Sequence, residues 1–417
     1  MKIFEIEGNK PLSGTIRISG AKNSAVALIP ACLLTNDLIT LTNVPDISDI
    51  NDLCEILEYL NVSVKRASES IVIDPSNIRN VLIPNELSSK LRASYYFMAS
   101  LLAKFKHVEM YFPGGCKIGS RPIDQTLKVF KALGANIKED GCLFTIDADE
   151  LTGCDITLDM PSVGATVNAI IVATLAKGKT VIHNAAREPE IVDLINMLTK
   201  LGANIEGAGN STISITGVSK LSGCFHNIIP DRIEAGTYTI LGALVGRYLK
   251  IDNIIPEHIK SLTDSLKEMG ADIDIFEDYL IINAVDNLMP IDIKTMGYPG
   301  FPTDLQQPIT TLLTQCYGVS KVNETIYENR YMNVPYLNKL GANIKVDGRI
   351  ATINGPSNLH GGVVLATDLR AGASLLLASL KASGKTTITN VEHILRGYEE
   401  IIEKLTNVGA KIEIKEI

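Results

Sequence analysis

Apolar positions recur along the chain with a helical period of three or four residues, and six such runs end in the same short phrase. Leu127, Phe130 and Leu133, for example, precede Gly134 and a strand-forming Ile137. Glycine or asparagine after such a run tolerates the left-handed backbone that ends many helices. The other copies are Leu60-Asn61-Val62-Ser63-Val64, Leu201-Gly202-Ala203-Asn204-Ile205, Met269-Gly270-Ala271-Asp272-Ile273, Leu340-Gly341-Ala342-Asn343-Ile344 and Val408-Gly409-Ala410-Lys411-Ile412. Their spacing of 68 to 73 residues predicts six structural units.

A second helix in each predicted unit is rich in small residues, as in Gly164-Ala165-Thr166 and Ala235-Gly236-Thr237. The unit therefore reads strand, strand, helix, strand, helix, strand. Small residues let helices approach closely, so we expect these helices inside and the sheets around them. Units of this length are too long for a solenoid repeat, and six of them predict two globular α/β domains of three units each.

Composition narrows the class of protein. The 417-residue chain has a net charge of −8 and no tryptophan, which argues against a broad nucleic-acid-binding face. It has no apolar run of 18 residues and no signal-peptide core at its start, so we expect no membrane segment. Seven scattered cysteines without a Cys-x-x-Cys pair indicate neither a disulfide framework nor a zinc site, and they favour a cytoplasmic location. Any anionic ligand must then be held by locally arranged cations.

Arginines gather at the predicted starts of helices. A cation there is unfavourable unless an anion is shared with it, because the helix N-terminus already carries partial positive charge. For any single arginine the alternative is an ion pair with a neighbouring acid, as Arg187 with Glu188 would permit. The set as a whole predicts a cleft between two domains that binds phosphate and carboxylate groups. Seven of the 12 arginines belong to it, together with Lys22: Arg92, Arg121, Arg187, Arg232, Arg330, Arg370 and Arg396.

One strand-to-helix turn differs from its counterparts. Four other units carry Asn43, Asn184, Asn253 or Asn390 at this place, whereas the second unit has Pro113-Gly114-Gly115-Cys116-Lys117-Ile118-Gly119-Ser120-Arg121-Pro122. Cations beside a thiol in an exposed loop favour its reactive thiolate form. We therefore predict that Cys116 is chemically active and that the other six cysteines are small apolar filler. The sequence places no histidine as its base.

Several short sequence motifs are distinctive. They are the loop around Cys116, Gly20-Ala21-Lys22-Asn23-Ser24, Ser162-Val163-Gly164-Ala165-Thr166, Asn184-Ala185-Ala186-Arg187-Glu188-Pro189-Glu190, Phe301-Pro302-Thr303-Asp304, Glu328-Asn329-Arg330 and Thr367-Asp368-Leu369-Arg370. Together they resemble the UDP-N-acetylglucosamine 1-carboxyvinyltransferase family from end to end. The resemblance implies transfer of the enolpyruvyl group of phosphoenolpyruvate to the 3-hydroxyl of UDP-N-acetylglucosamine, with release of phosphate and with no cofactor or metal. This is the first committed step of peptidoglycan synthesis. The fold it implies is a two-domain inside-out α/β barrel, with domains at 22–229 and at 1–21 plus 230–417.

The same resemblance implies roles for individual residues. Cys116 would be the general acid that protonates the methylene carbon, and Asp304 the base or orienter of the sugar hydroxyl. For Asp304, a helix N-cap is the alternative role, compatible with the first. The phosphoenolpyruvate contacts implied are Lys22, Arg121, Arg330, Arg370 and Arg396, where planar arginine forks suit a phosphate and a carboxylate. Lys22 and Arg396 also count among the catalytic residues, and Asp368 among the substrate-binding ones. The nucleotide-sugar contacts implied are Asn23, Arg92, Arg121, Pro122, Ile123, Asp124, Gln125, Ser162, Val163, Gly164 and the backbone of Ile326.

Some points stay open at this level. Met160 stands where many members of the family have lysine, and Gln125 is not the commonest residue in its loop, which leaves the nucleotide affinity open. Another enolpyruvyl transferase of the same fold, such as a 3-phosphoshikimate 1-carboxyvinyltransferase, is the alternative function. A non-enzymatic paralogue that binds a UDP-sugar is a third alternative. The presence of four residues weighs against it: Lys22, Cys116, Asp304 and Arg396. We expect no nucleic-acid or membrane partner, and a monomer or weak homo-oligomer.

Overall fold

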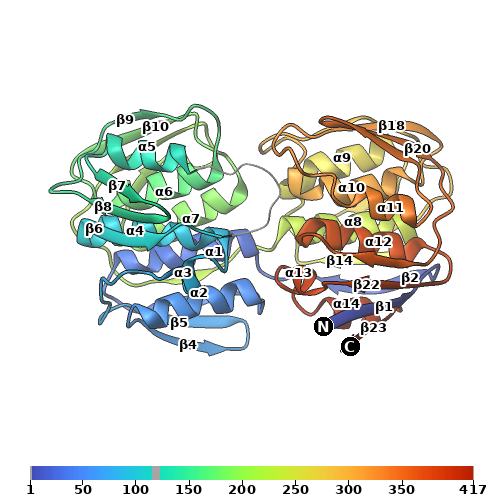
Figure 1. Cartoon of the computed structure of the whole chain (residues 1–417), viewed down its shortest axis with the longest axis horizontal. Coiled ribbons are helices and arrows are strands. Elements are labelled where there is room, and N and C mark those ends of the chain that lie inside the picture. Colours follow the sequence, from blue (N-terminus) through green and yellow to red (C-terminus); the bar gives the residue numbers. More distant parts are fainter. Residues whose placement is uncertain (1, 115–122, 417) are drawn as a thin grey trace. The chain divides into compact units, whose positions relative to one another are not determined.

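The computed structural model describes residues 2–114 and 123–416. They divide into two compact units, one of residues 2–19 and 230–416 and the other of residues 20–114 and 123–229 (Figure 1). Within the described residues, the recurring order of elements is strand, helix, strand, helix, strand, strand. This is the predicted repeat read from a different starting point. None of the described helices is both long and apolar enough to cross a membrane.

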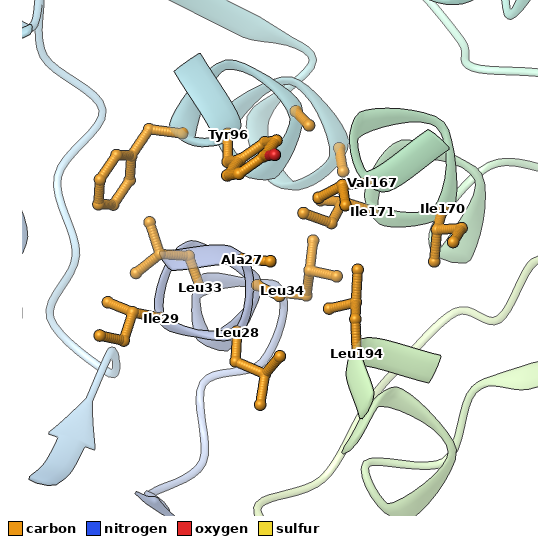
Figure 2. Close-up of a cluster of buried hydrophobic side chains, with 14 of the residues drawn as sticks. Ala27, Leu28, Ile29, Leu33, Leu34, Tyr96, Val167, Ile170, Ile171 and Leu194 are labelled. Carbon is orange, nitrogen blue, oxygen red and sulfur yellow. The ribbon is translucent and has the colours of Figure 1, made fainter. Parts of the chain in front are cut away.

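The unit of residues 20–229 has small-residue helices at its core. Helices α1 (Lys22–Ala31), α4 (Tyr96–Phe105) and α6 (Val163–Thr174) are buried along most of their length. Figure 2 shows Leu28, Tyr96 and Val167 of these helices gathered with Leu194 of α7 (Pro189–Lys200). The expectation that these helices lie inside is therefore confirmed for this unit.

Sheets of three or four described strands pack around these helices. In sheet order they are β13 (Phe225–Asn227), β3 (Ile39–Thr42), β5 (Ser70–Asp74) and β4 (Ser63–Ala67); β6 (His107–Tyr111), β8 (Leu143–Asp147) and β7 (Asn136–Asp140); β11 (Asn204–Glu206), β12 (Thr212–Thr216), β10 (Lys179–His183) and β9 (Asp155–Thr157). The remaining helical segments are η1 (Cys32–Leu34), α2 (Ser48–Tyr59), α3 (Asn85–Ser88), η2 (Arg92–Tyr95) and α5 (Asp124–Ala132).

The unit of residues 2–19 and 230–416 repeats the plan. Its buried helices are α8 (Arg232–Val245), α10 (Gln306–Leu313) and α12 (Leu369–Lys381). Its sheets are β15 (Asp272–Ile275), β16 (Tyr279–Asn283), β14 (Gly246–Asp252) and β2 (Leu12–Arg17); β17 (Ile293–Lys294), β18 (Gly318–Asn323), β20 (Ile350–Gly355) and β19 (Ile344–Asp347); β21 (Val363–Leu365), β22 (Lys385–Thr389), β1 (Lys2–Glu7) and β23 (Lys411–Glu416). Shorter helical segments are η3 (Pro256–Ile259), α9 (Lys260–Glu268), η4 (Thr303–Leu305), α11 (Val334–Lys339), α13 (Glu392–Leu395) and α14 (Ile401–Asn407).

Strand pairing joins distant parts of the sequence. β2 pairs in parallel with β14, and β13 pairs in parallel with β3. β2 and β13 are each the edge strand of a sheet whose other strands come from more than a hundred residues away in the chain. Local periodicity predicts such strands but not their neighbours.

The repeated phrase ends helices as predicted. Asn61 and the glycines at the five matching positions all have positive φ, between 62° and 104°. Residues other than glycine and asparagine are disfavoured in this left-handed region of φ and ψ. The left-handed helix ends read from the sequence are confirmed.

One predicted helix start is wrong. Arg396 is the C-cap of the short helix α13, and α14 begins only at Ile401. An extra helical turn therefore separates β22 from the helix that ends at the repeated phrase. Arg396 lies at the end of a helix, where a cation complements the partial negative charge of the last carbonyls.

Candidate functional site

The predicted site residues fall in both units, and three of them are not described. Cys116, Arg121 and Pro122 lie outside the described residues. The unit of residues 230–416 carries Asp304, Ile326, Arg330, Asp368, Arg370 and Arg396. The unit of residues 20–229 carries Lys22, Asn23, Arg92, Ile123, Asp124, Gln125, Ser162, Val163 and Gly164.

Asp304 lies between two buried arginines. It sits in η4, directly ahead of α10, and its Oδ1 accepts a hydrogen bond from Nη2 of Arg330. Its Oδ2 accepts from Nη2 of Arg370 at 3.0 Å. Arg330 and Arg370 are 2% and 4% exposed, so both charges need a partner inside the protein. The structure thus brings together three predicted residues that are separated by 26 and 66 positions in sequence.

The electrostatics of this cluster hold Asp304 in its charged form. Burial alone would raise the pKa of Asp304, but the positive charges of Arg370 and Arg330 outweigh it and hold the pKa well below its usual range. Burial alone would lower the pKa of Arg370, and the Asp304 carboxylate outweighs it and raises that pKa. The alternative role of Asp304 as a helix N-cap is not seen, because neither η4 nor α10 has a side-chain cap.

Two further residues hold Arg370 in place. Its Nη1 donates to the hydroxyl of Tyr398 at 3.2 Å, and Tyr398 also bonds Thr237 of α8 at 2.9 Å. Asp368 is the N-cap of α12, where its Oδ1 accepts from the backbone amides of Arg370 and Ala371. Asp368, two positions before Arg370, therefore caps the helix, and the acid that pairs with the guanidinium is Asp304. Sequence reasoning missed Tyr398, which has no local signal.

Cations in the other unit have different surroundings. Lys22 opens α1 and pairs with Asp49 of α2 at 2.7 Å, with both side chains largely buried. The guanidinium carbon of Arg92 lies 5.5 Å from the ring centre of Tyr95 and 5.3 Å from that of Phe112. Such contacts with aromatic faces fix the plane of a guanidinium. Asn23 follows Lys22 on α1 and is half-buried.

Gly164 is required by the packing of Tyr95. A Cβ at position 164 would lie 1.5 Å from the hydroxyl oxygen of Tyr95, so no other residue fits without displacing that ring. Ser162 caps α6 by accepting a hydrogen bond from the amide of Ala165 at 3.3 Å. Val163, between them, is exposed. The predicted Ser-Val-Gly motif is therefore a helix start beside the Arg92 and Tyr95 pair.

Gln125 holds a neighbouring loop of its own unit. Its Oε1 accepts from the backbone amide of Asp159 at 2.9 Å, next to the exposed Met160. Asp124 is exposed at the first residue of α5, and Ile123 ahead of it is buried. The side-chain amide oxygen of Gln125 thus holds the backbone at Asp159 and Met160.

The described cysteines range from buried to half-buried and exposed. All six are free thiols, and Cys32, Cys54 and Cys316 are buried. Burial raises the pKa of Cys54 to about 11 and that of Cys316 to about 12. Cys142 is exposed, so the expectation of apolar filler is wrong for this residue, which lies in the turn between β7 and β8. Within the described part of the chain, no three His, Cys, Asp or Glu side chains are grouped as a metal site.

Comparisons with known proteins identify the family. The family model of EPSP synthase (3-phosphoshikimate 1-carboxyvinyltransferase) matches residues 6–405. A UDP-N-acetylglucosamine 1-carboxyvinyltransferase 2 from Listeria monocytogenes serovar 1/2a is 51% identical over 407 residues, which cover 98% of this chain and 96% of the relative. The chain therefore belongs to the carboxyvinyltransferase family that contains both enzymes, in agreement with its motifs.

Solved structures agree with this assignment. The enolpyruvyl transferase NikO from Streptomyces tendae matches with a TM-score of 0.91 at 28% identity, over 99% of each chain. EPSP synthase from Acinetobacter baumannii matches with a TM-score of 0.76 at 19% identity over the whole of both chains, which shows the shared fold. The predicted fold, an inside-out α/β barrel in two parts, is that of the enolpyruvyl transferases.

Proposed function

We propose that this chain transfers the enolpyruvyl group of phosphoenolpyruvate to the 3-hydroxyl of UDP-N-acetylglucosamine and releases phosphate. The observation that carries the proposal is the Asp304 carboxylate held between Arg330 and Arg370. A group able to accept a proton there lies beside two cations able to bind a phosphate and a carboxylate. The named relatives at about 50% identity favour the nucleotide sugar over shikimate 3-phosphate as the acceptor.

The reaction proceeds by addition and elimination. The 3-hydroxyl oxygen bonds to the central carbon of the enolpyruvyl group as a proton is added to its methylene carbon. The bond from that central carbon to the phosphate oxygen then breaks, and the new methyl group loses a proton to restore the double bond. Phosphate leaves with the bonding electron pair, so atoms and charges balance without a metal or a redox step.

Two ionisable side chains divide the proton transfers. Asp304 takes or orients the proton of the sugar hydroxyl, and Cys116 delivers the proton to the methylene carbon. A substrate anion that shares Arg330 and Arg370 weakens their hold on Asp304, and this raises the pKa of that carboxyl toward the range useful for a base. In the ligand-free protein, the Asp304 carboxylate thus compensates the positive charges of Arg330 and Arg370 until the substrate anion binds.

In this proposal the chain has two domains, at 22–229 and at 1–21 plus 230–417. Residues of both domains bind the same two substrates. Lys22, Arg121 and Arg396 join Arg330 and Arg370 in binding phosphoenolpyruvate. The nucleotide sugar contacts Asn23, Arg92, Ile123, Asp124, Gln125, Ser162, Val163, Gly164 and the backbone of Ile326. Asp368 supports Arg370 from the N-cap of α12.

Phosphate release from phosphoenolpyruvate tests the function directly. We expect release with UDP-N-acetylglucosamine and none without it. Shikimate 3-phosphate is the control acceptor, and release with it alone would assign the chain to the alternative function. We propose a cytoplasmic location, which the six free thiols support, and a monomer or weak homo-oligomer, which sedimentation can test.

A further inference from the structure

In three of the six sequence repeats, the residue that follows the strand between the two helices joins that strand to its parallel neighbour. Asn43, Asn184 and Asn253 follow β3, β10 and β14, and all three have positive φ. Each side-chain amide donates to the carbonyl of the residue that follows the parallel neighbouring strand, at 2.8, 3.0 and 2.7 Å. The asparagine thus ties the ends of two parallel strands together.

The sequence repeat that contains Asp304 has no asparagine at this position. Glu324 follows β18 at the matching position, and Thr325 performs the task of the asparagine. The hydroxyl of Thr325 donates to the carbonyl of Thr295, which follows β17, at 2.5 Å. Its amide also donates to the hydroxyl of Thr295 at 2.9 Å. The side chain of Glu324 is therefore not needed to join these strands.

Glu324 instead connects two loops that carry site residues. The residue is 0% exposed. Its Oε1 accepts from the backbone amides of Ile326 at 2.8 Å and Tyr327 at 3.1 Å. Its Oε2 accepts from the hydroxyl of Thr303 at 2.9 Å, in the turn that carries Asp304. A completely buried carboxylate is costly unless such donors satisfy it, so both loops are held to it.

The Thr303 hydroxyl relays this contact to Arg330. Nε of Arg330 lies 3.3 Å from Oγ1 of Thr303 and can only donate, so the threonine oxygen accepts there. The proton of that hydroxyl is then directed to Glu324. The guanidinium of Arg330 is thereby oriented at Nε by Thr303 while its Nη2 reaches Asp304.

We propose that Glu324 is a positioning residue for both substrates. One carboxylate oxygen acts through Thr303 to orient Arg330 toward phosphoenolpyruvate. The other fixes the Ile326 backbone toward the nucleotide sugar. The inference rests on the proposed function, and it adds two residues, Glu324 and Thr303, that the family motifs do not assign.

Substitutions at Thr303 isolate the Arg330 branch. Thr303→Val keeps the shape but leaves Nε of Arg330 without its acceptor, so we expect KM for phosphoenolpyruvate to rise about tenfold. KM for UDP-N-acetylglucosamine should stay within about twofold, since the Ile326 branch is intact. Thr303→Ser keeps the hydroxyl and should restore the parental KM. Equal impairment of the serine and valine variants, or unchanged KM in the valine variant, would overturn the relay.

Substitutions at Glu324 separate the two branches. Glu324→Gln retains an acceptor for the two amides but presents an NH₂ group to Thr303, so only KM for phosphoenolpyruvate should rise. Glu324→Ala removes both contacts and should raise both KM values, about tenfold each. Glu328→Gln is the matched control, because Glu328 is exposed and pairs with Arg349 at 2.9 Å. Kinetic constants of Glu324→Gln equal to those of this control would contradict the proposal.

Hydrogen exchange distinguishes a failure of this proposal from a failure of the proposed function. In the ligand-free protein, the amides of Ile326 and Tyr327 should exchange faster in Glu324→Ala than in Glu324→Gln or the parent. A parent that releases no phosphate with UDP-N-acetylglucosamine refutes the function, while the exchange result still tests the contact. Unchanged exchange in Glu324→Ala refutes the positioning role in either case.

Discussion

Arg370 and Arg92 occupy corresponding helix starts in the two units, yet their surroundings differ. Arg370 is almost completely buried and pairs with Asp304 and Tyr398. Arg92 is half-buried and lies against the rings of Tyr95 and Phe112. In the first case a carboxylate compensates the charge, and in the second the aromatic rings orient it. Corresponding positions of a repeated fold thus place one arginine in a buried ion pair and the other against aromatic rings.

Cys116 provides the largest expected effect, because it would supply the acid that complements the base Asp304. Cys116→Ser removes the acid and should lower kcat by about 10² to 10⁴ at neutral pH. Cys116→Asp should retain activity that falls as pH rises through its pKa, since the carboxyl must be protonated to donate. The epoxide fosfomycin, which alkylates this cysteine in the family, should modify the parent but not the Asp variant.

Mass spectrometry checks the position of the adduct. Cys32, Cys54 and Cys316 are buried and should stay unmodified, whereas Cys142 is exposed and is the competing site to monitor. A Cys142→Ser variant is the control and should react like the parent. Full activity in Cys116→Ser, or an adduct on another cysteine, would contradict the role of Cys116.

Asp304→Asn should remove most activity and also change how the site binds anions. The amide cannot accept the proton, so we expect kcat to fall by about 10² or more. Arg330 and Arg370 lose their charge partner, which should lower the free energy of unfolding by about 3 kcal/mol. Inorganic phosphate should then raise the melting temperature of this variant more than that of the parent, because it binds the two unpaired arginines. Equal phosphate effects in both proteins would show that Asp304 does not compete with anions.

Replacing Arg370 or Arg92 by alanine compares how much each arginine contributes to the free energy of unfolding. Arg370→Ala leaves buried polar partners behind and should lower the free energy of unfolding by about 3 kcal/mol or more. Arg92→Ala loses contacts with aromatic faces and should lower it by about 1 kcal/mol. Denaturant titration of both variants measures the difference. Similar losses would mean that the two arginines are held alike, and the comparison would fail.

The pH dependence of stability should reveal the Asp304 pair. Because the folded pKa of Asp304 is depressed, its contribution is fully present above its unfolded pKa of about 4 and is lost as pH falls below it. The difference in unfolding free energy between the parent and Asp304→Asn should therefore be constant from about pH 5 to 8 and shrink below about pH 4. A difference that persists unchanged at lower pH would argue against the ion pair.

Gly164→Ala probes the aromatic side of the comparison. The added methyl displaces the Tyr95 ring and with it a contact of Arg92. We expect a loss of about 1–3 kcal/mol in stability and a higher KM for UDP-N-acetylglucosamine, with kcat little changed. Gly178→Ala, where a methyl meets no atom within 4 Å but φ is positive, controls for backbone strain alone.

The sequence by itself determined the repeated parts of this protein. Six helix-ending phrases, the small-residue helices and the cations at helix starts follow from local rules of period, backbone freedom and helix charge. These rules act over a few residues, so they can be read without a structure. They misplaced Arg396 because an extra turn of helix, α13, leaves no strong mark in the pattern.

Only the tertiary structure decided which charges meet. Asp304 pairs with Arg330 and Arg370 at separations of 26 and 66 residues, and Asp368 turns out to cap a helix. Glu324 and Thr303 come together from different loops, and Gly164 is explained by a tyrosine 69 positions earlier in the chain, Tyr95. Such contacts depend on how whole helices and sheets pack, because burial forces each charge to find a partner wherever the fold provides one.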